Sequence, residues 1–263
     1  MGIKPRTLLT TDEQGLPEFQ VMNENKAHFN FGDKVGLMVF RAWYPCISDP
    51  KHFANSQAYN FPVRLGYVDD PFNLDNIVND GASNAWNLEN WIACAQQLEE
   101  DGCKALVGGC GLTAMMQSQL AAAVTIPVYS STMLFFPFLL STLASDKKIA
   151  VLTVNENSLN MNNGSLFDEC GIDKSRMVIQ GMDQSSHADD WSTQFNDVDY
   201  SKDRVENAIV SVATALIENN PDVGQIILEC TEMPPFADAI RKATQLPVFD
   251  AVDMTKMVYN LVR

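Results

Sequence analysis

Several signatures of known chemistry are missing from this chain of 263 residues. It has three histidines, far apart in the sequence, and its six cysteines form no CxxC pair. A histidine-rich metal centre, a zinc ribbon and a thioredoxin motif are therefore not expected. The sequence also contains no GxxxxGKS/T phosphate loop, no HExxH and no GxSxG, and its GGCG segment lacks the later glycine of a dinucleotide fingerprint. These absences favour chemistry without a metal or an organic cofactor.

Basic residues and long apolar runs are scarce too. Lys and Arg number 18 against 33 Asp and Glu, so the formal net charge is -15, which argues against a nucleic-acid partner. The longest apolar run, residues 133–140, contains a proline and falls far short of the roughly 20 residues that a membrane span needs. The N-terminal residues are polar and lack the apolar run of a secretory signal. We therefore expect a cytoplasmic protein with reduced thiols and no membrane partner.

What the chain does contain is an alternation of strand and helix patterns, typical of an α/β protein. A continuous apolar run predicts a buried parallel strand at residues 35–40, residues 61–68 are a second strand candidate, and residues 104–107 predict another buried strand. Between the last two, residues 88–100 carry apolar side chains at helical spacing. Residues 1–33 show no sustained period, and we predict an N-terminal arm there.

The second half of the chain repeats the plan of the first. Residues 148–154 match residues 34–40 in apolar pattern and opening lysine, and the strand before Cys230 matches the strand before Cys110. Each cysteine is followed 17 residues later by the proline of an x-Pro-Val-aromatic sequence. We therefore predict an internal duplication with two pseudo-symmetric open parallel-sheet domains and an active site in the cleft between them.

The repeat also predicts the domain boundaries. The first domain covers residues 34–132 and carries Cys110, and the second covers residues 133–247 and carries Cys230. We expect the C-terminal segment, residues 248–263, to complete the first domain. The sequence leaves the oligomeric state open, a homo-oligomer included.

Cys110 and Cys230 are the candidate catalytic residues, because each follows a strand where ligands of open parallel sheets bind. A thiol before a helix N-terminus faces unpaired N–H groups that favour the thiolate, and Thr231 is a candidate cap for the second helix. Two thiols on opposite sides of one carbon would suit proton removal by one and proton delivery by the other. We interpret the other cysteines as small buried hydrophobes, namely Cys46, Cys94, Cys103 and Cys170.

At these residues the chain resembles the aspartate/glutamate racemase superfamily. The resemblance covers about residues 35–262, and its specific parts are GCG at 109–111, LECTEMPP at 228–235 and LPVFD at 246–250. It implies two α/β domains and a cofactor-independent, metal-independent enzyme. In that family, two cysteines exchange protons at the carbon next to a carboxylate, and the resemblance implies this role for the cysteine pair here.

One departure from the amino-acid racemases matters. They usually carry Cys-Asn-Thr at the first cysteine, where the Asn and Thr help to hold the substrate, whereas this chain has Cys110, Gly111 and Leu112. Together with the later Glu-Cys-Thr-Glu-x-Pro-Pro motif, this looks more like the algal-type dimethylsulfoniopropionate lyase branch. The resemblance thus implies a β-elimination that releases dimethyl sulfide and leaves acrylate. An aspartate/glutamate or hydantoin racemase stays open as an alternative, and so does a non-catalytic carboxylate-binding protein.

A small sulfonium carboxylate needs an aromatic wall for its cation and hydrogen-bond donors for its carboxylate. Aromatic residues near the expected ligand-binding ends of the strands are candidates for the wall. Backbone N–H groups, a threonine hydroxyl and an arginine are candidates for the carboxylate. The predicted substrate-binding residues are Arg41, Trp43, Tyr44, Gly111, Phe135, Thr231 and Glu232.

Overall fold

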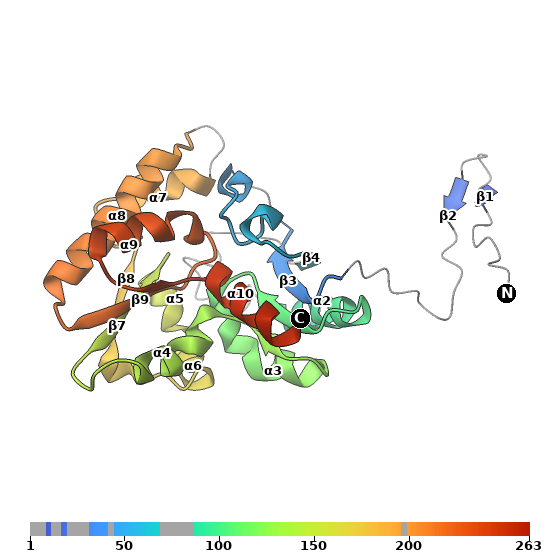
Figure 1. The fold of residues 1–263 in the computed structure, drawn as a ribbon, viewed down its shortest axis with the longest axis horizontal. Coiled ribbons are helices and arrows are strands. Elements are labelled where there is room, and N and C mark those ends of the chain that lie inside the picture. The colour runs from blue at the N-terminus through green and yellow to red at the C-terminus, as the bar shows by residue number, and fades with distance from the viewer. Residues whose placement is uncertain (1–8, 12–16, 20–31, 42–44, 69–86, 196–198) are drawn as a thin grey trace.

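The computed structural model describes residues 9–11, 17–19, 32–41, 45–68, 87–195 and 199–263. Most of the predicted arm at residues 1–33 lies outside these ranges, although β1 (Leu9–Thr11) and β2 (Pro17–Phe19) form a short antiparallel pair. The rest of the described chain forms two four-stranded sheets flanked by helices (Figure 1). Among the helices so described, none combines the length and the apolar character that crossing a membrane requires.

The first sheet has the strand order β4-β3-β5-β6, and all its strands are parallel. Its strands are β3 (Val35–Phe40), β4 (Val63–Val68), β5 (Ala105–Gly108) and β6 (Val128–Tyr129). Helix α2 (Leu88–Glu100) packs against β3, β4 and β5 through its buried side chains. The strands and the helix predicted from the apolar pattern of this half are thereby confirmed.

The second sheet has the order β10-β9-β7-β8, again all parallel. Its strands are β7 (Lys148–Thr153), β8 (Met177–Gly181), β9 (Val223–Leu228) and β10 (Val248–Phe249). When β3, β4, β5 and β6 are matched with β7, β8, β9 and β10, the two sheets have the same order. The predicted pair of α/β halves with one topology is confirmed.

Shorter elements connect the strands. The remaining α-helices are α3 (Gln117–Ala123), α4 (Phe136–Ser141), α5 (Glu156–Leu159), α6 (Met161–Glu169), α7 (Ala188–Ser192), α8 (Lys202–Asn219), α9 (Ala237–Thr244) and α10 (Ala251–Val262). Seven 3-10 turns complete the elements of the described residues, namely η1 (Pro45–Ser48), η2 (Ser56–Ala58), η3 (Gly111–Met116), η4 (Thr132–Phe135), η5 (Lys174–Arg176), η6 (Thr193–Phe195) and η7 (Pro234–Phe236).

The inner strands of both sheets, β3, β5, β7 and β9, are buried on both faces, as their apolar sequences predict. Successive strand residues point to opposite faces, so Leu37 enters the core between the sheets and Met38 enters the core beneath α2. In β7, Ile149 enters the same central core and Ala150 enters the outer core beneath α8. The central core draws on both halves and on Met254 of α10, so it holds the two sheets together.

The C-terminal segment serves both halves. Strand β10 pairs with β9 in the second sheet, whereas α10 packs against β3 and β5 of the first sheet (Figure 1). Asp250 begins α10, and its side chain accepts hydrogen bonds from the backbone N–H groups of Val252 and Asp253 at 2.8 and 2.9 Å. This cap turns the chain from one sheet toward the other.

Candidate active site

Cys110 and Cys230 occupy equivalent places in the two halves. Each lies two residues after an inner strand, Cys110 after β5 and Cys230 after β9. The Thr231 hydroxyl donates to the Gly109 carbonyl oxygen at 2.8 Å, so the residues next to the two cysteines touch. The structure therefore brings the strand ends that carry both cysteines together.

Glycine is required after Cys110 because another chain segment approaches there. A Cβ atom at Gly111 would lie 2.0 Å from Oε1 of Glu229 and 2.4 Å from its carbonyl oxygen. Neither distance is tolerable for two non-bonded heavy atoms. The carboxyl group of Glu229 thus fills the space beside Cys110 that a longer side chain at position 111 would need.

Both cysteines of the site have thiol pKa values raised above the usual range. Burial raises the pKa of Cys110, and the negative charge of Glu229 raises it further, against a hydrogen bond from the Leu112 backbone. Burial also raises the pKa of Cys230, followed by the charges of Glu232 and Glu229. Both residues are partly accessible, yet the surrounding protein removes enough water to disfavour the thiolate.

The predicted effect of a helix N-terminus is present at Cys110, where the Leu112 backbone N–H lowers the thiol pKa, but burial and the Glu229 charge outweigh it. Cys110 precedes the 3-10 turn η3, and Cys230 precedes a loop and the turn η7, so neither sulfur lies at the end of a long α-helix. The predicted role of Thr231 as a helix cap is wrong, because the Thr231 hydroxyl donates its hydrogen bond to the Gly109 carbonyl oxygen. Proline does occupy the first turn of η7, as the sequence predicted.

Glu229 is a buried carboxyl group between the two cysteine segments. Its Oε2 accepts a hydrogen bond from the Thr153 hydroxyl at 2.9 Å, and its Oε1 has no hydrogen-bond partner among the described residues. Burial raises the pKa of Glu229 to about 7, against the opposing effect of the Thr153 hydrogen bond. The site thus contains a carboxyl group that exchanges its proton near neutral pH.

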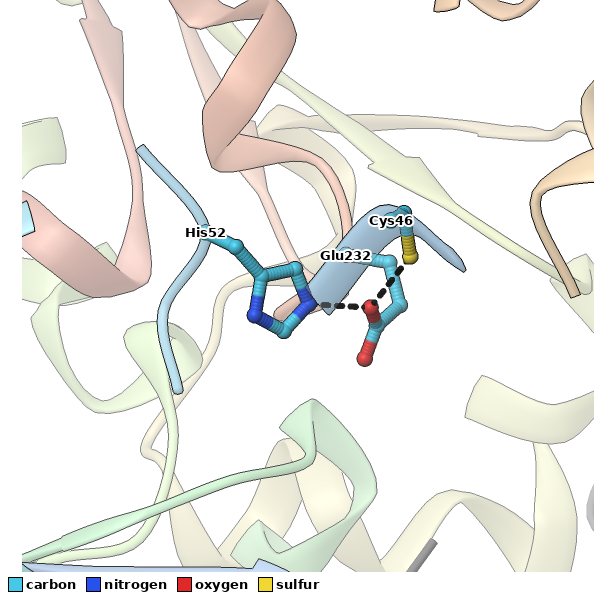
Figure 2. A group of neighbouring side chains, drawn as sticks. All are labelled: Cys46, His52 and Glu232. Carbon is cyan, nitrogen blue, oxygen red and sulfur yellow. Dashed lines mark hydrogen bonds and ion pairs between the residues drawn. The ribbon is translucent and has the colours of Figure 1, made fainter. Parts of the chain in front are cut away.

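A second polar cluster is formed by Cys46, His52 and Glu232, all buried (Figure 2). Its Cys46 and Glu232 interact electrostatically with Cys230. The Cys46 thiol donates to Oε2 of Glu232 at 3.2 Å, and Nε2 of His52 contacts the same oxygen. The Ala54 backbone N–H donates to Nδ1 of His52 at 3.1 Å. The neutral ring therefore carries its proton on Nε2 and donates it to Glu232.

This cluster also offers the ligand atoms of a metal site. The sulfur, nitrogen and carboxylate oxygen of Cys46, His52 and Glu232 lie within 4.8 Å of one another. A histidine that binds a metal usually donates from its other ring nitrogen, whereas Nδ1 of His52 accepts a hydrogen bond. The proton arrangement fits hydrogen bonding within the cluster better than metal ligation.

A small cavity of about 120 Å³ opens onto this region. It is lined by Val39, Phe40, Ile47, His52, Phe53, Ala54, Leu65, Tyr67, Gly109, Thr231 and Glu232. Gly109 and Thr231 each adjoin one of the two cysteines in sequence. The Arg41 guanidinium lies over the Tyr67 ring, 5.4 Å from its centroid, so Arg41 is near the cavity wall.

The predicted substrate-binding residues separate into three groups. Thr231 and Glu232 line the cavity, with Arg41 next to it and Gly111 buried against Glu229. Phe135 stacks on Tyr129 and packs against Phe249, in a different hollow that α4 and α10 border. Trp43 and Tyr44 lie outside the described residues.

Sequence reasoning missed three residues of the site. Glu229 lies inside the motif around Cys230, and the unusual glycine at position 111 was the signal for it. Cys46 and His52 lie 186 and 180 residues from Glu232, and nothing in the sequence indicates that they meet. Their one hint is that their loop follows β3 on the ligand-binding side of the first sheet.

Named relatives show the family of the chain, although no family model matches it. A dimethylsulfoniopropionate lyase from Durusdinium sp. clade D is 30% identical over 206 residues, which cover 77% of this chain and 67% of that protein. Dimethylsulfoniopropionate lyase 3 from Emiliania huxleyi is 28% identical over 213 residues, which cover 74% of this chain. The chain spans only 55% of the length of this second relative.

Solved structures place the fold. An aspartate racemase homologue from Pyrococcus horikoshii matches with a TM-score of 0.55 and 15% identity, over 88% of this chain and 99% of that chain. Allantoin racemase from Klebsiella pneumoniae matches with a TM-score of 0.54 and 14% identity, over 88% of this chain and 87% of that chain. At this identity the likeness concerns the fold alone. The chain therefore belongs to the dimethylsulfoniopropionate lyase family and has the α/β fold of the aspartate/glutamate racemase superfamily.

Proposed function

We propose that this protein is a cofactor-independent lyase that splits dimethylsulfoniopropionate into dimethyl sulfide and acrylate, with Cys110 and Cys230 as its catalytic pair. The observation that carries the proposal is the family membership, since the relatives are named dimethylsulfoniopropionate lyases. The equivalent positions of the two cysteines at adjoining strand ends support it. We place the substrate between the two halves, next to both thiols.

The reaction is a β-elimination. A thiolate removes a proton from the carbon next to the carboxylate, and the electron pair of that C–H bond forms the new carbon–carbon double bond. The C–S bond breaks, its electron pair stays on sulfur, and dimethyl sulfide leaves. Acrylate remains, and one proton is released in the complete reaction.

The residues around the cavity supply the binding groups. We assign the substrate carboxylate to the N–H groups of Gly111 and Thr231 and to Arg41, which lies at the cavity wall. Trp43 and Tyr44 remain our candidates for the wall that receives the sulfonium cation, together with Tyr67, whose ring lines the cavity. We also expect a cytoplasmic location, because all six cysteines are free thiols.

Racemisation of an amino acid is the second candidate, because a pair of thiols suits transfer of a proton from one face of a carbon to the other. Against it stands the carboxyl group of Glu229, which fills the place beside Cys110 where amino-acid racemases carry the asparagine that helps to hold the substrate. The two reactions also differ in their proton balance, because the elimination releases one proton and racemisation releases none.

The test is a substrate panel with the purified protein. Headspace gas chromatography measures dimethyl sulfide, proton NMR measures acrylate, and polarimetry follows L-aspartate, L-glutamate and a hydantoin. We expect equal amounts of dimethyl sulfide and acrylate from dimethylsulfoniopropionate, and constant optical rotation for the others. Racemisation without sulfide release would replace the lyase assignment with the second candidate.

A further inference from the structure

Glu229 is a buried titratable residue without a role in the elimination described above. Its side chain is 3% exposed, and it reaches the site from the end of β9. One carboxyl oxygen is held by the Thr153 hydroxyl, which fixes the plane of the group. The other oxygen, Oε1, is buried and has no hydrogen-bond partner among the residues that the structure describes. An unpaired polar atom in such a place calls for an explanation.

The unpaired oxygen points at the backbone beside Cys110. A Cβ on Gly111 would lie 2.0 Å from Oε1, so the carboxyl group rests directly against the residue that follows the cysteine. Among the charged groups that act on Cys110, Glu229 has the largest effect. For Cys230 the largest is Glu232, whose Oε2 already accepts hydrogen bonds. Each thiol thus has its own neighbouring carboxyl group.

We propose that Glu229 accepts the thiol proton of Cys110 through its free Oε1, so that Cys110 is the base of the reaction and Cys230 stays a thiol. This assignment rests on the lyase function proposed above. We infer that it acts through the cysteine, because the carboxyl group is buried against Gly111, the residue that follows Cys110.

The protons balance over one turnover. The Cys110 S–H proton moves to the Glu229 carboxylate, which leaves a thiolate and a neutral carboxylic acid. The thiolate takes the proton from the carbon next to the substrate carboxylate, and dimethyl sulfide leaves with the electron pair of the C–S bond. Cys110 is then a thiol again, and Glu229 releases its proton to solvent. The proton released is the one that the overall reaction produces.

The surroundings of Glu229 suit this cycle. The titratable groups that act with it are Cys110 and Cys230, and Thr153 on β7 supplies the opposing hydroxyl. A carboxyl group with a pKa of about 7 holds a proton during the elimination and still loses it at neutral pH. A sulfonium cation in the site would also favour the thiolate over the thiol.

The experiment measures the labelling of Cys110 by iodoacetamide between pH 5.5 and 9, with peptide mass spectrometry, in the wild type and in Glu229→Gln. The substrate-free enzyme is used, so the result does not depend on lyase activity. For the wild type we expect the labelling rate to rise in a step near pH 7, where Glu229 ionises and becomes able to accept the thiol proton. In Glu229→Gln we expect the step to vanish, and dimethyl sulfide release to fall by about 100-fold or more. Glu218→Gln, an exposed change on α8, should leave both unchanged.

A wild-type labelling rate that stays level or falls near pH 7, or faster labelling of Cys110 at pH 7.5 in Glu229→Gln than in the wild type, would overturn the proposal, because the Glu229 charge would then only disfavour the thiolate. If Glu229→Gln fails to fold, Thr153→Val replaces it. Loss of the hydroxyl donor should raise the pKa of Glu229 and move the step above pH 7, and an unmoved step would contradict the assignment. A wild-type step without dimethyl sulfide release would refute the lyase function and leave the Glu229 assignment standing.

Discussion

Burial governs the chemistry of single residues in this site. It raises the pKa of both cysteine thiols and of Glu229, so the resting site holds neutral thiols beside a carboxyl group poised near neutral pH. Ionising both buried thiols would carry a large desolvation cost. In our proposal, Glu229 accepts the proton whose loss forms the Cys110 thiolate.

The raised pKa of Glu229 makes stability depend on pH. Its value is about 7 in the folded protein and near 4.5 when the chain is unfolded, so the folded state binds more protons between these pH values. The free energy of unfolding should therefore fall as pH rises from about 4.5 to 7. Glu229→Gln lacks this dependence, and its stability relative to the wild type should rise by on the order of 3 kcal/mol over that interval.

Urea denaturation of both proteins at pH 5 and pH 8 measures this difference. Subtracting the free energy of unfolding of the wild type from that of Glu229→Gln at each pH removes the contribution of Asp250. Burial raises the pKa of Asp250 to about 6, and this residue is present in both proteins. An equal stability difference at both pH values would contradict the assigned ionisation of Glu229.

The loop after β5 depends on glycine at position 111. In Gly111→Ala the new methyl group would meet Oε1 and the backbone carbonyl of Glu229, and a backbone atom cannot rotate away. We expect a loss of about 1–3 kcal/mol in the free energy of unfolding and loss of most of the dimethyl sulfide release. Gly224→Ala on β9 is the control, since its Cβ would meet only the side chains of Leu143 and Lys147. Equal behaviour of the two variants would rule out the close packing of Gly111 on Glu229.

The segment after β3 forms a bridge between the two halves. It carries Cys46 and His52 onto Glu232, and it adds an ion pair from Lys202 to Asp49 at 2.5 Å. Ion pairs with one exposed partner add little stability, about 0–1 kcal/mol. The buried hydrogen bonds to Glu232 therefore matter more, because they fix the carboxylate beside Cys230.

His52→Ala removes one of the two described donors to Glu232, and we expect kcat/KM for dimethyl sulfide release to fall about 10- to 100-fold. His52→Gln presents an amide donor near the place of Nε2 and should recover part of the loss. His187→Gln, at the start of α7, is the matched control. Equal activity of His52→Ala and the control would show that the hydrogen bond to Glu232 plays no part in the reaction.

The sequence predicted those parts of the site that local pattern determines. The repeat of strand, cysteine and proline located Cys110 and Cys230, because the two halves fold by the same local rules. It did not locate the cluster of Cys46, His52 and Glu232, because that contact depends on how the two sheets pack. It also assigned Thr231 to a helix cap, whereas the neighbouring half offers the Gly109 carbonyl as a partner.

For the whole molecule, we propose that residues 34–132 with α10 form one domain and that residues 133–249 form the other, since β10 pairs with β9 and the boundary predicted at residue 247 cuts that sheet. Met254 of α10 is fully buried in the central core. Met254→Ala should lower the free energy of unfolding by about 2–5 kcal/mol and speed hydrogen exchange in β3 and β5. Met257 on the same helix is 40% exposed, and Met257→Ala should lower the free energy of unfolding by less than about 1 kcal/mol. Faster exchange confined to β7 and β8 would contradict these boundaries.

The cooperation of two equivalent cysteines from the two halves is the central claim, and release of dimethyl sulfide by Cys110→Ser and Cys230→Ser tests it most directly. Serine keeps the shape of the side chain and removes the acidic thiol. With Cys170→Ser as a buried control, we predict wild-type release from the control, a loss of about 1000-fold or more in Cys110→Ser, which lacks the base, and a smaller loss of about 10-fold or more in Cys230→Ser, which lacks the second thiol next to the substrate; the melting temperatures of the two active-site variants should equal that of the wild type. Undiminished release by either active-site variant would contradict the claim.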